Sequence, residues 1–219
     1  MRLSNVLPFA GLVAALPAAE PDFIGGILPS AGPSGHEVQI DSIAYAGSGC
    51  NAGTVAGLLA SDLTAVTLLF SEFIAESGKG VAAGKLRRNC NLLVKLKYPA
   101  GWQFSVFKAD YRGYAQIPAG DVGTCKSTYY FQGISGQATS QMTINGPYEN
   151  NYLKSDQFGL QTTVWSPCGQ EGILSINSEV RIAPKDSNTA KAGLLTVDSA
   201  DLKFKQIHYL QWQKCTRRA

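Results

Sequence analysis

Short stretches in which apolar and polar residues alternate recur along the chain, and they constrain its fold more than any other feature. The clearest is LLVKLK at residues 92–97, where one parity is apolar and the other carries two lysines. A period of two places successive side chains on opposite faces of a strand. About ten such runs follow one another at roughly 8–15-residue spacing, separated by turns rich in Gly and Pro. The pattern predicts an all-β fold, an antiparallel, jelly-roll-like β-sandwich with little helix.

The predicted strands extend from residue 38 to residue 212. They are the runs at 38–42, 66–70, 92–97, 102–106, 129–132, 141–144, 162–165, 173–177, 180–182 and 202–212. Only residues 52–60 and 81–86 favour short helices. Strand parity breaks near Val106-Phe107, so this segment is either bulged or buried on both faces. If it is bulged, Arg112 and Tyr114 project from a sheet face beside aromatic neighbours.

The first 18 residues have the pattern of a secretory signal peptide. Arg2 supplies the positive start, residues 6–16 are mostly apolar, and Leu16-Pro17-Ala18 suits a signal peptidase. The apolar stretch is shorter than the roughly 20 residues that span a bilayer. We predict an exported protein that is free of the membrane once the leader is removed. Its parts are a signal peptide at 1–18, an irregular lead-in at 19–36, one β-sandwich domain at 37–216 and a tail at 217–219.

The composition excludes several classes of protein. The chain has 45% hydrophobic and 16% charged residues, which is enough apolar material for a core and too little charge for a disordered or coiled-coil chain. Its 19 Lys and Arg residues against 16 Asp and Glu residues give a net charge of only +3. Such weak basicity without a block of Lys and Arg argues against nucleic acid as a partner.

Export determines how the five cysteines are interpreted. They are Cys50, Cys90, Cys125, Cys168 and Cys215. In an oxidising compartment the default is two disulfides and one left-over thiol, and the count alone allows fifteen arrangements. We favour Cys50 with Cys90 and Cys168 with Cys215, each closing a loop of roughly 40–50 residues. A zinc site is disfavoured, because no C-x-x-C spacing exists and the two histidines lie near opposite ends of the chain.

No catalytic motif stands out. A serine triad lacks the G-x-S-x-G elbow, and its base would have to be His36 or His208, of which we interpret His208 as a polar strand residue. Glycoside hydrolysis needs two carboxyl groups roughly 5–10 Å apart. The carboxylates that lie on or near predicted strands are Glu72, Glu76, Asp110, Glu171 and Glu179. Nothing in the sequence selects a pair among them.

Two further groups of residues are candidates for binding. Asp198 and Asp201 form an Asp-x-x-Asp step that suits either calcium or a turn; we favour the turn and predict no metal and no cofactor. The segment Tyr111-Arg112-Gly113-Tyr114, with Trp102 close by in sequence, combines aromatic rings with a cation, as sites for sugar rings or a protein partner do. The alternative is that these aromatic residues belong to the core. Trp102, Tyr111, Arg112 and Tyr114 are therefore the candidate ligand-binding residues.

The order of several short motifs resembles one known family. The motifs are GC at 49–50, SDLTA at 61–65, LF at 69–70, RRNC at 87–90, YPAGW at 98–102, YRGYA at 111–115, YYFQG at 129–133, WSPCG at 165–169, DSAD at 198–201 and LQWQKC at 210–215. Together they resemble the secreted, mostly fungal family catalogued as domain of unknown function 4360. The resemblance implies an exported, β-rich protein without an established activity. It supports pairing of the cysteines at 50, 90, 168 and 215, whereas Cys125 is a departure.

The leading hypothesis is a secreted, non-catalytic binding protein that acts on a glycan, a cell-wall component or a host protein. It rests on the lack of a recognisable catalytic constellation together with many Tyr and Arg residues able to lie at the surface. The alternative is a secreted hydrolase of polysaccharides that uses an Asp/Glu pair. A third possibility is a purely structural protein.

Overall fold

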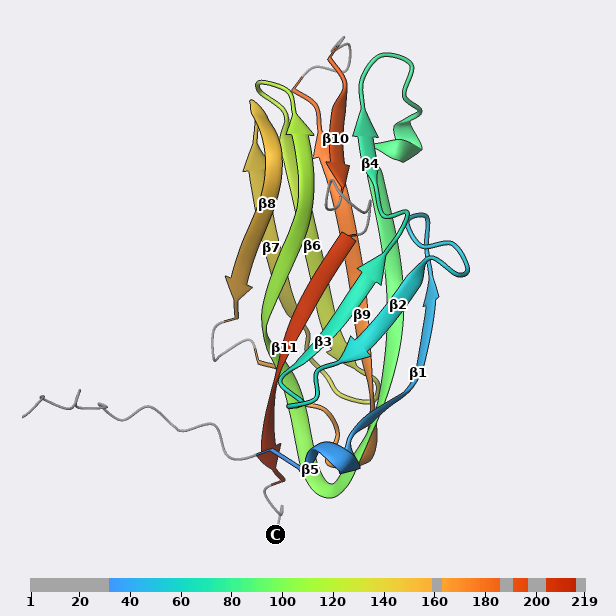
Figure 1. Cartoon of the computed structure of the whole chain (residues 1–219), viewed down its shortest axis with the longest axis vertical. Coiled ribbons are helices and arrows are strands. Elements are labelled where there is room, and N and C mark those ends of the chain that lie inside the picture. Colours follow the sequence, from blue (N-terminus) through green and yellow to red (C-terminus); the bar gives the residue numbers. More distant parts are fainter. Residues whose placement is uncertain (1–31, 159–162, 186–190, 197–203, 216–219) are drawn as a thin grey trace, which may run out of the picture.

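The strands form two layers that stack on each other, and the neighbouring strands within each layer run antiparallel (Figure 1). The computed structural model describes residues 32–158, 163–185, 191–196 and 204–215, which form eleven strands and two short 3₁₀ turns. The 3₁₀ turns are η1 (Gly35–Glu37) and η2 (Ala83–Lys85), and the strands are β1 (Gln39–Ala46), β2 (Val55–Leu59), β3 (Ala65–Phe70), β4 (Ala75–Ser77), β5 (Arg87–Ile117), β6 (Val122–Phe131), β7 (Ala138–Asn145), β8 (Tyr148–Gln157), β9 (Gly169–Ala183), β10 (Gly193–Thr196) and β11 (Phe204–Lys214). All pairings described between these strands are antiparallel, and the predicted all-β sandwich with little helix is confirmed.

The long strand β5 belongs to both layers. Its first part, residues 87–97, pairs with β1 and β9, and its second part, residues 102–117, pairs with β11, β10 and β8. Between the two parts the chain turns at Tyr98-Pro99-Ala100-Gly101, where Gly101 takes the left-handed conformation that favours glycine (φ 81°). One layer therefore has the order β1–β5–β9–β6–β7 and the other β2–β3–β11–β5–β8.

The core lies between the inward faces of the two layers. In the first part of β5, Leu92, Val94 and Leu96 are fully buried, as the alternation in the sequence predicts. Across the core, the ring of Phe104 meets that of Phe131 in the opposite layer edge-on, with centroids 5.1 Å apart. Burying a side chain of this size stabilises the fold by about 1.5–3 kcal/mol. One continuous cluster of buried apolar side chains joins both layers.

A bulge interrupts the second part of β5. Between Tyr209 and Leu210 of β11 the pairing register shifts, and Phe107 of β5 is left without an opposite residue. The predicted break in strand parity near Val106-Phe107 is thus a β-bulge. Beyond it, the even-numbered residues from 108 to 116 lie on the outer side of the layer, where Asp110 is nevertheless buried, and the odd-numbered side chains face the core. The bulge therefore decides which side chains of β5 reach the surface.

Three predictions about local structure were wrong, and the strands β4, β8 and β10 were not predicted. Residues 52–60 contain the strand β2, because pairing with β3 along its whole length outweighs a weak helix preference. Residues 81–86 contain only the single 3₁₀ turn η2. Residues 163–165, the described part of one predicted strand, are irregular. The strand β8 was missed, since its sequence is polar and only Tyr152 is buried.

Several predictions fall on parts of the chain outside the described residues. These are the signal peptide at 1–18, most of the lead-in, the pair Asp198 and Asp201, and the tail at 217–219. Among the residues that are described, no helix has the length and hydrophobicity needed to cross a bilayer.

Candidate functional site

The outward side of strands β11, β5 and β8 brings aromatic, apolar and charged side chains together. We call this surface the aromatic face. It consists of Phe107, Lys108, Asp110, Arg112 and Tyr114 of β5, Ile207 and Tyr209 of β11, and Leu153 and Ser155 of β8. Residues directly opposite each other on paired strands share a face. The register therefore places Arg112 between Lys205 and Leu153, and the side chain of Leu153 is 64% exposed.

Tyr209 is the aromatic group of this face that contacts Asp110, Lys108 and Phe107. Its hydroxyl donates a hydrogen bond of 2.8 Å to Oδ2 of Asp110. The Nζ of Lys108 lies 4.4 Å from the centre of the Tyr209 ring and 3.3 Å from Oδ1 of Asp110. The ring of Phe107 lies 6.4 Å from the same ring. These contacts hold a half-buried tyrosine in one orientation on a rigid strand.

The same contacts fix the charge of Asp110. Burial alone would raise its pKa, but hydrogen bonds from Ser155 and Tyr209 and the ammonium of Lys108 outweigh burial and lower the pKa. The pKa of Tyr209 is raised, because its hydroxyl donates a hydrogen bond to the Asp110 carboxylate and is partly buried. Asp110 is therefore an ionised hydrogen-bond acceptor at neutral pH, with no proton to donate to a leaving group.

Tyr114 extends the face along β5. Its hydroxyl lies 3.4 Å from Oε1 of Glu149 on β8 and donates to it. Desolvation, followed by the negative charge of Glu149, raises the pKa of Tyr114. One row nearer to Tyr209, the side chain of Arg112 is exposed. The outward side of β5 extends about 26 Å along the strand from Lys108 to Gln116, the next outward residue after Tyr114. This length suits a chain-like ligand better than a single small molecule.

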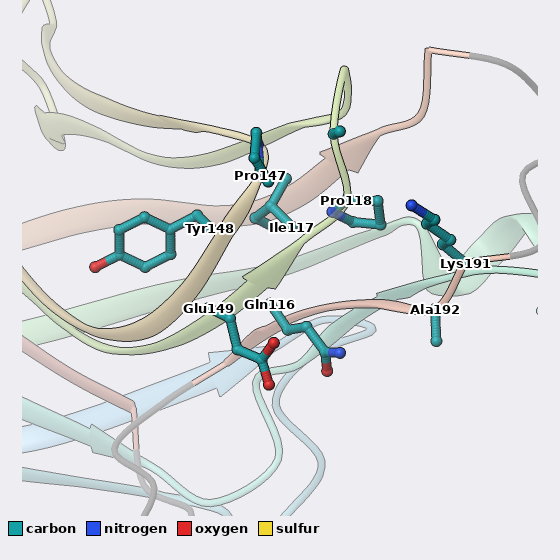
Figure 2. A pocket seen from close by; sticks show the side chains of 9 residues that line it. Gln116, Ile117, Pro118, Pro147, Tyr148, Glu149, Lys191 and Ala192 are labelled. Carbon is teal, nitrogen blue, oxygen red and sulfur yellow. The ribbon is translucent and has the colours of Figure 1, made fainter.

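Beyond Tyr114 the aromatic face ends in a cavity of about 460 Å³, which we call the tip pocket (Figure 2). It is lined by residues 116–119, 147–149 and 191–192. Figure 2 shows the side chains of Gln116 and Glu149 on one side of it and Lys191 on another. Its volume lies in the range of about 300–1,000 Å³ that is usual for small-molecule sites.

In β11 the usual distribution of polar and apolar side chains is reversed. Ile207 and Tyr209 face outward, whereas Gln206 and His208 are fully buried. Burying polar groups is unfavourable unless they form hydrogen bonds. The Oε1 of Gln206 accepts a bond of 2.8 Å from Ser178, and Nδ1 of His208 lies 3.0 Å from the Tyr129 hydroxyl. Desolvation lowers the pKa of His208 to about 3, so this side chain stays neutral inside the sandwich.

The outward side of β6, β7 and β9 has a different character. We call it the polar face. It consists of Thr124, Lys126, Thr128, Thr139, Gln141, Thr143, Asn177, Glu179 and Arg181. The hydroxyls of Thr128 and Thr139 lie 3.4 Å apart, and Arg87 from the neighbouring strand β5 forms a 2.6 Å ion pair with Glu179. Most side chains here are short and polar, and the one aromatic ring described at an outward position of these three strands is that of Tyr130 on β6.

Of the predicted ligand-binding residues, the structure brings together only Arg112 and Tyr114. Tyr111 is fully buried, its hydroxyl donates to the carbonyl of Ser140, and desolvation raises its pKa to about 12. Its placement on the core side of β5 removes Tyr111 from the site. Trp102 is also separate, because it precedes Tyr114 by twelve residues, or about 40 Å, along β5.

The candidate catalytic groups are not brought together either. His36 is exposed on η1, and His208 lies inside the sandwich. Each predicted carboxylate has a partner: Asn51 donates to Glu72, Lys85 pairs with Glu76, Lys95 with Glu171, Arg87 with Glu179, and Tyr209 donates to Asp110. Asp110 belongs to the aromatic face, whereas Glu171 and Glu179 belong to the opposite layer. Within the described chain, no cluster of three or more His, Cys, Asp or Glu residues could hold a metal ion.

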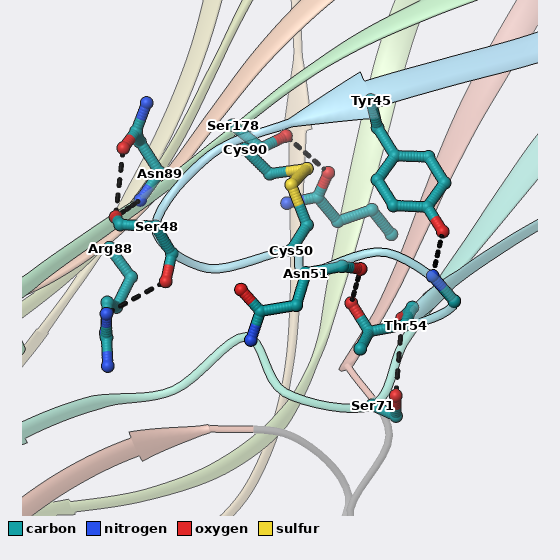
Figure 3. The surroundings of a disulfide bond; sticks show 12 residues. Tyr45, Ser48, Cys50, Asn51, Thr54, Ser71, Arg88, Asn89, Cys90 and Ser178 are labelled. Carbon is teal, nitrogen blue, oxygen red and sulfur yellow. Dashed lines mark hydrogen bonds between the residues drawn. A yellow bond between two sulfur atoms is a disulfide. The ribbon is translucent and has the colours of Figure 1, made fainter.

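The disulfides join the same two pairs that the sequence favours. Cys50 bonds to Cys90 across 40 residues, and Cys168 bonds to Cys215 across 47. In the chain-entropy model, each contributes about 4 kcal/mol. Figure 3 shows the first bond holding the β1–β2 loop against β5, where Nη1 of Arg88 also donates to the loop carbonyl of Ser48 at 2.9 Å. Neither bond involves a residue of the aromatic face.

Cys125 is the remaining thiol. It is fully buried, and its Sγ lies 3.6 Å from the hydroxyl of Tyr152. Desolvation raises its pKa to about 12, so it is a protonated thiol that external reagents do not reach in the folded chain.

The sequence alone missed Lys108, Tyr209, Glu149 and Lys191. Lys108 follows from the bulge, because its parity reverses there. Tyr209 was hidden by the reversed pattern of β11, in which polarity suggests that Gln206 and His208 face solvent. The pocket residues lie on β8 and ahead of β10, two strands that carry no clear alternation.

Sequence comparison places the chain in a family. A family model described as "Domain of unknown function (DUF4360)" matches residues 36–215. The chain belongs to the DUF4360 family. A protein of the fungus Arthroderma benhamiae, described as an "Uncharacterized secreted protein", is 42% identical to the DUF4360 chain over 212 residues, covering 90% of this chain and 86% of that protein. The DUF4360 chain is a secreted protein.

Comparison with solved structures finds looser likenesses. TmCBM61 in complex with β-1,4-galactotriose is 10% identical, with a TM-score of 0.31; the match covers 86% of this chain and 97% of that one. The enzymatically active domain of bacteriophage CBA120 tailspike protein 4 is 14% identical, with a TM-score of 0.23; that match covers 85% of this chain and 21% of the other. Both TM-scores are too low to bear on the ligand of the DUF4360 chain.

Proposed function

We propose that this secreted DUF4360 protein is a glycan-binding module and that the aromatic face is its ligand surface. The observation that carries the proposal is the Tyr209 ring, held by Asp110 and Lys108 on the sheet, with the exposed Arg112 on the same face. Sugar rings present apolar C–H faces and many hydroxyl groups. An ordered aromatic ring next to fixed donors and acceptors complements both.

Charge distribution favours a glycan over a folded protein partner. Lys108, Asp110 and Arg112 occupy the middle strand of the aromatic face, where Asp110 is buried and Lys108 and Arg112 reach the surface. The central part of protein–protein interfaces is depleted of charged residues, because desolvating them is costly. Hydroxyl-rich ligands replace part of the lost hydration by hydrogen bonds to these same groups. A cell-wall polysaccharide is therefore the partner that suits this surface best.

The carboxylates support binding rather than cleavage. A glycosidase needs one carboxyl group that is protonated near neutral pH and a second one close to it. The lowered pKa of Asp110 works against the first requirement. Glu171 and Glu179 face outward from the other layer, so neither is positioned to complete a pair with Asp110.

The test is a depletion assay with insoluble wall polysaccharides: chitin, β-1,3-glucan, cellulose, mannan and galactan. We expect at least one of them to remove the wild-type protein from solution. The double variant Tyr209→Ala/Tyr114→Ala should remain in solution. The matched control Thr128→Ala/Thr139→Ala changes the polar face and should bind as wild type does.

Three results would contradict the proposal. The first is that none of the polysaccharides depletes the protein, and the second is that both double variants bind equally well. The third is release of soluble sugar that disappears in Asp110→Asn, which would make the protein a hydrolase.

A further inference from the structure

The tip pocket continues the aromatic face at the place where the sheet ends. Strand β5 stops at Ile117 and β8 begins at Tyr148, so the pocket lies where these two paired strands end. Gln116 lies opposite Glu149, one row beyond Tyr114. The hydrogen bond from Tyr114 to Glu149 links the aromatic face directly to the pocket wall. A chain-like ligand that follows the face therefore arrives at the pocket with one of its ends.

The turns beside the pocket are held in place by backbone hydrogen bonds. The N–H of Asp121 donates to the carbonyl of Pro118, and the N–H of Gly146 donates to the carbonyl of Asp121. A Cβ added at Gly146 would lie 1.8 Å from the Pro118 oxygen, so only glycine permits this close approach. The N–H of Lys185 adds a bond of 2.9 Å to Oδ1 of Asp121. The proline-bearing walls of the pocket are thus in place before any ligand arrives.

The chemistry of the pocket matches a neutral sugar. Gln116 offers an amide, Glu149 a carboxylate and Lys191 an ammonium group, each from a different segment of the chain. Among the described residues, no ion pair involves Glu149 or Lys191. Hydroxyl groups donate to a carboxylate and accept from an ammonium, so a polyol uses all three side chains. A charged sugar would meet one attractive and one repulsive charge in Glu149 and Lys191, so the pocket has no net charge with which to select it.

We propose that the tip pocket holds the terminal residue of a neutral glycan, so that the protein recognises chain ends. The inference rests on the proposed function, because it requires the rest of the glycan to lie on the aromatic face. It also gives the bound glycan a direction. The chain end occupies the pocket, and the following sugar residues extend past Tyr114 and Arg112 toward Tyr209.

Chain length separates binding of ends from binding of chain interiors. The probe is a neutral β-1,3-glucan, β-1,4-glucan, mannan or galactan, separated into short and long soluble fractions and titrated calorimetrically into the full-length secreted protein. For an end-binding protein the number of sites stays at one per glycan chain as the chains lengthen. For a protein that binds interiors the number of sites grows with the mass of glycan.

We expect one site per chain for the wild-type protein. The variant Gln116→Ala/Lys191→Ala should bind at least fivefold more weakly, and the number of protein molecules bound per glycan chain should increase with glycan mass. The control Gln141→Ala/Lys126→Ala removes the same residue types from the polar face and should behave as wild type. Oligosaccharides whose end is oxidised to a carboxylate should bind more weakly than the neutral ones.

The outcomes distinguish the inference from the function on which it rests. If the wild-type protein binds glycan but its sites grow with mass, or if the pocket variant binds ends unchanged, chain-end recognition is wrong and the binding function stands. Tighter binding of oxidised ends would overturn the assignment to neutral sugars. If no glycan binds at all, the proposed function fails and the inference fails with it.

Discussion

The two outward faces of the sandwich share strand geometry but differ in what they expose. On the polar face, the hydroxyls of Thr128 and Thr139 lie within hydrogen-bond distance of each other, and the charged Glu179 is paired with Arg87. On the aromatic face, Tyr209 and Ile207 face outward while Gln206 and His208 of the same strand are buried. Water alone satisfies the hydrogen-bonding groups of a polar outward face. Apolar groups turned outward at the expense of buried polar ones indicate a surface built for contact.

This difference implies that side chains on the two sides of the aromatic-face layer have separate roles. We expect inward residues to determine stability and outward residues to determine binding. Stability and binding of matched variants test that division, beginning with the change from which we expect the largest effect.

Tyr111 and Tyr114 lie three residues apart on β5 and face opposite ways. We expect Tyr111→Ala to lower the free energy of unfolding by about 3–5 kcal/mol, because it leaves a cavity in the core. Tyr114→Ala should lower it by less than about 1 kcal/mol, since its side chain is at the surface. Urea denaturation of the two variants measures both values. Equal losses would mean that the assigned faces of β5 are wrong.

Buried His208 makes stability depend on pH. Its pKa in the folded chain is about 3 against an ordinary value of 6.5, so below pH 6.5 the unfolded chain takes up a proton that the folded chain does not. Stability is therefore lost as the pH falls from about 6.5 toward 3. Between pH 7 and pH 4 this group should remove about 3 kcal/mol.

The measurement is the difference in unfolding free energy between pH 7 and pH 4 for the wild-type protein and for His208→Gln. The variant should lose about 3 kcal/mol less over this range, because glutamine does not titrate. The exposed His36→Gln serves as the control and should follow wild type. An unchanged pH profile in His208→Gln would show that His208 is not held neutral inside the sandwich.

Removal of the ordered ring tests the outward side. Tyr209→Ala should weaken glycan binding at least tenfold, or about 1.4 kcal/mol, which is the loss expected of a central aromatic contact. Tyr209→Phe keeps the ring but loses the hydrogen bond to Asp110, and it should retain most of the affinity. Calorimetric titration of both variants with the bound glycan separates stacking from hydrogen bonding. If Tyr209→Phe lowers the glycan affinity as much as Tyr209→Ala does, Tyr209 does not contribute through ring stacking.

On the polar face we expect the smallest effect. The ion pair between Arg87 and Glu179 is exposed on the arginine side, and such pairs contribute less than about 1 kcal/mol. A double-mutant cycle with Arg87→Ala and Glu179→Ala measures the coupling by chemical denaturation. Glycan affinity should stay unchanged in all three variants. A loss of affinity there would mean that the ligand also touches this face.

The sequence predicts the parts of the fold that depend on local pattern. Strict alternation in residues 92–97 identified a core strand, and the parity break near Val106-Phe107 located the bulge. Turn residues marked the reversal at Tyr98-Pro99-Ala100-Gly101 within β5. The two cysteine pairs favoured from the sequence are also the ones bonded in the structure.

The site was harder to predict, because it depends on pairing between distant strands. Tyr111 looked equivalent to Tyr114 until the bulge fixed which parity is inward. In β11 the buried Gln206 and His208 bond to Ser178 and Tyr129, partners that no local pattern reveals. The strand β8 has only one buried side chain, so alternation could not identify it. The tip pocket exists only because β5, β8 and the chain ahead of β10 meet there.

The most direct test of the account is to map where a neutral oligosaccharide touches the protein, by following backbone amide signals in an NMR titration. We predict that signals of Tyr209, Arg112, Tyr114 and Glu149 shift together and saturate at the same ligand concentration, while those of the polar face stay in place. Shifts confined to the polar face, or shifts around Trp102 without any at Tyr209, would contradict the central claim that the aromatic face is the ligand surface.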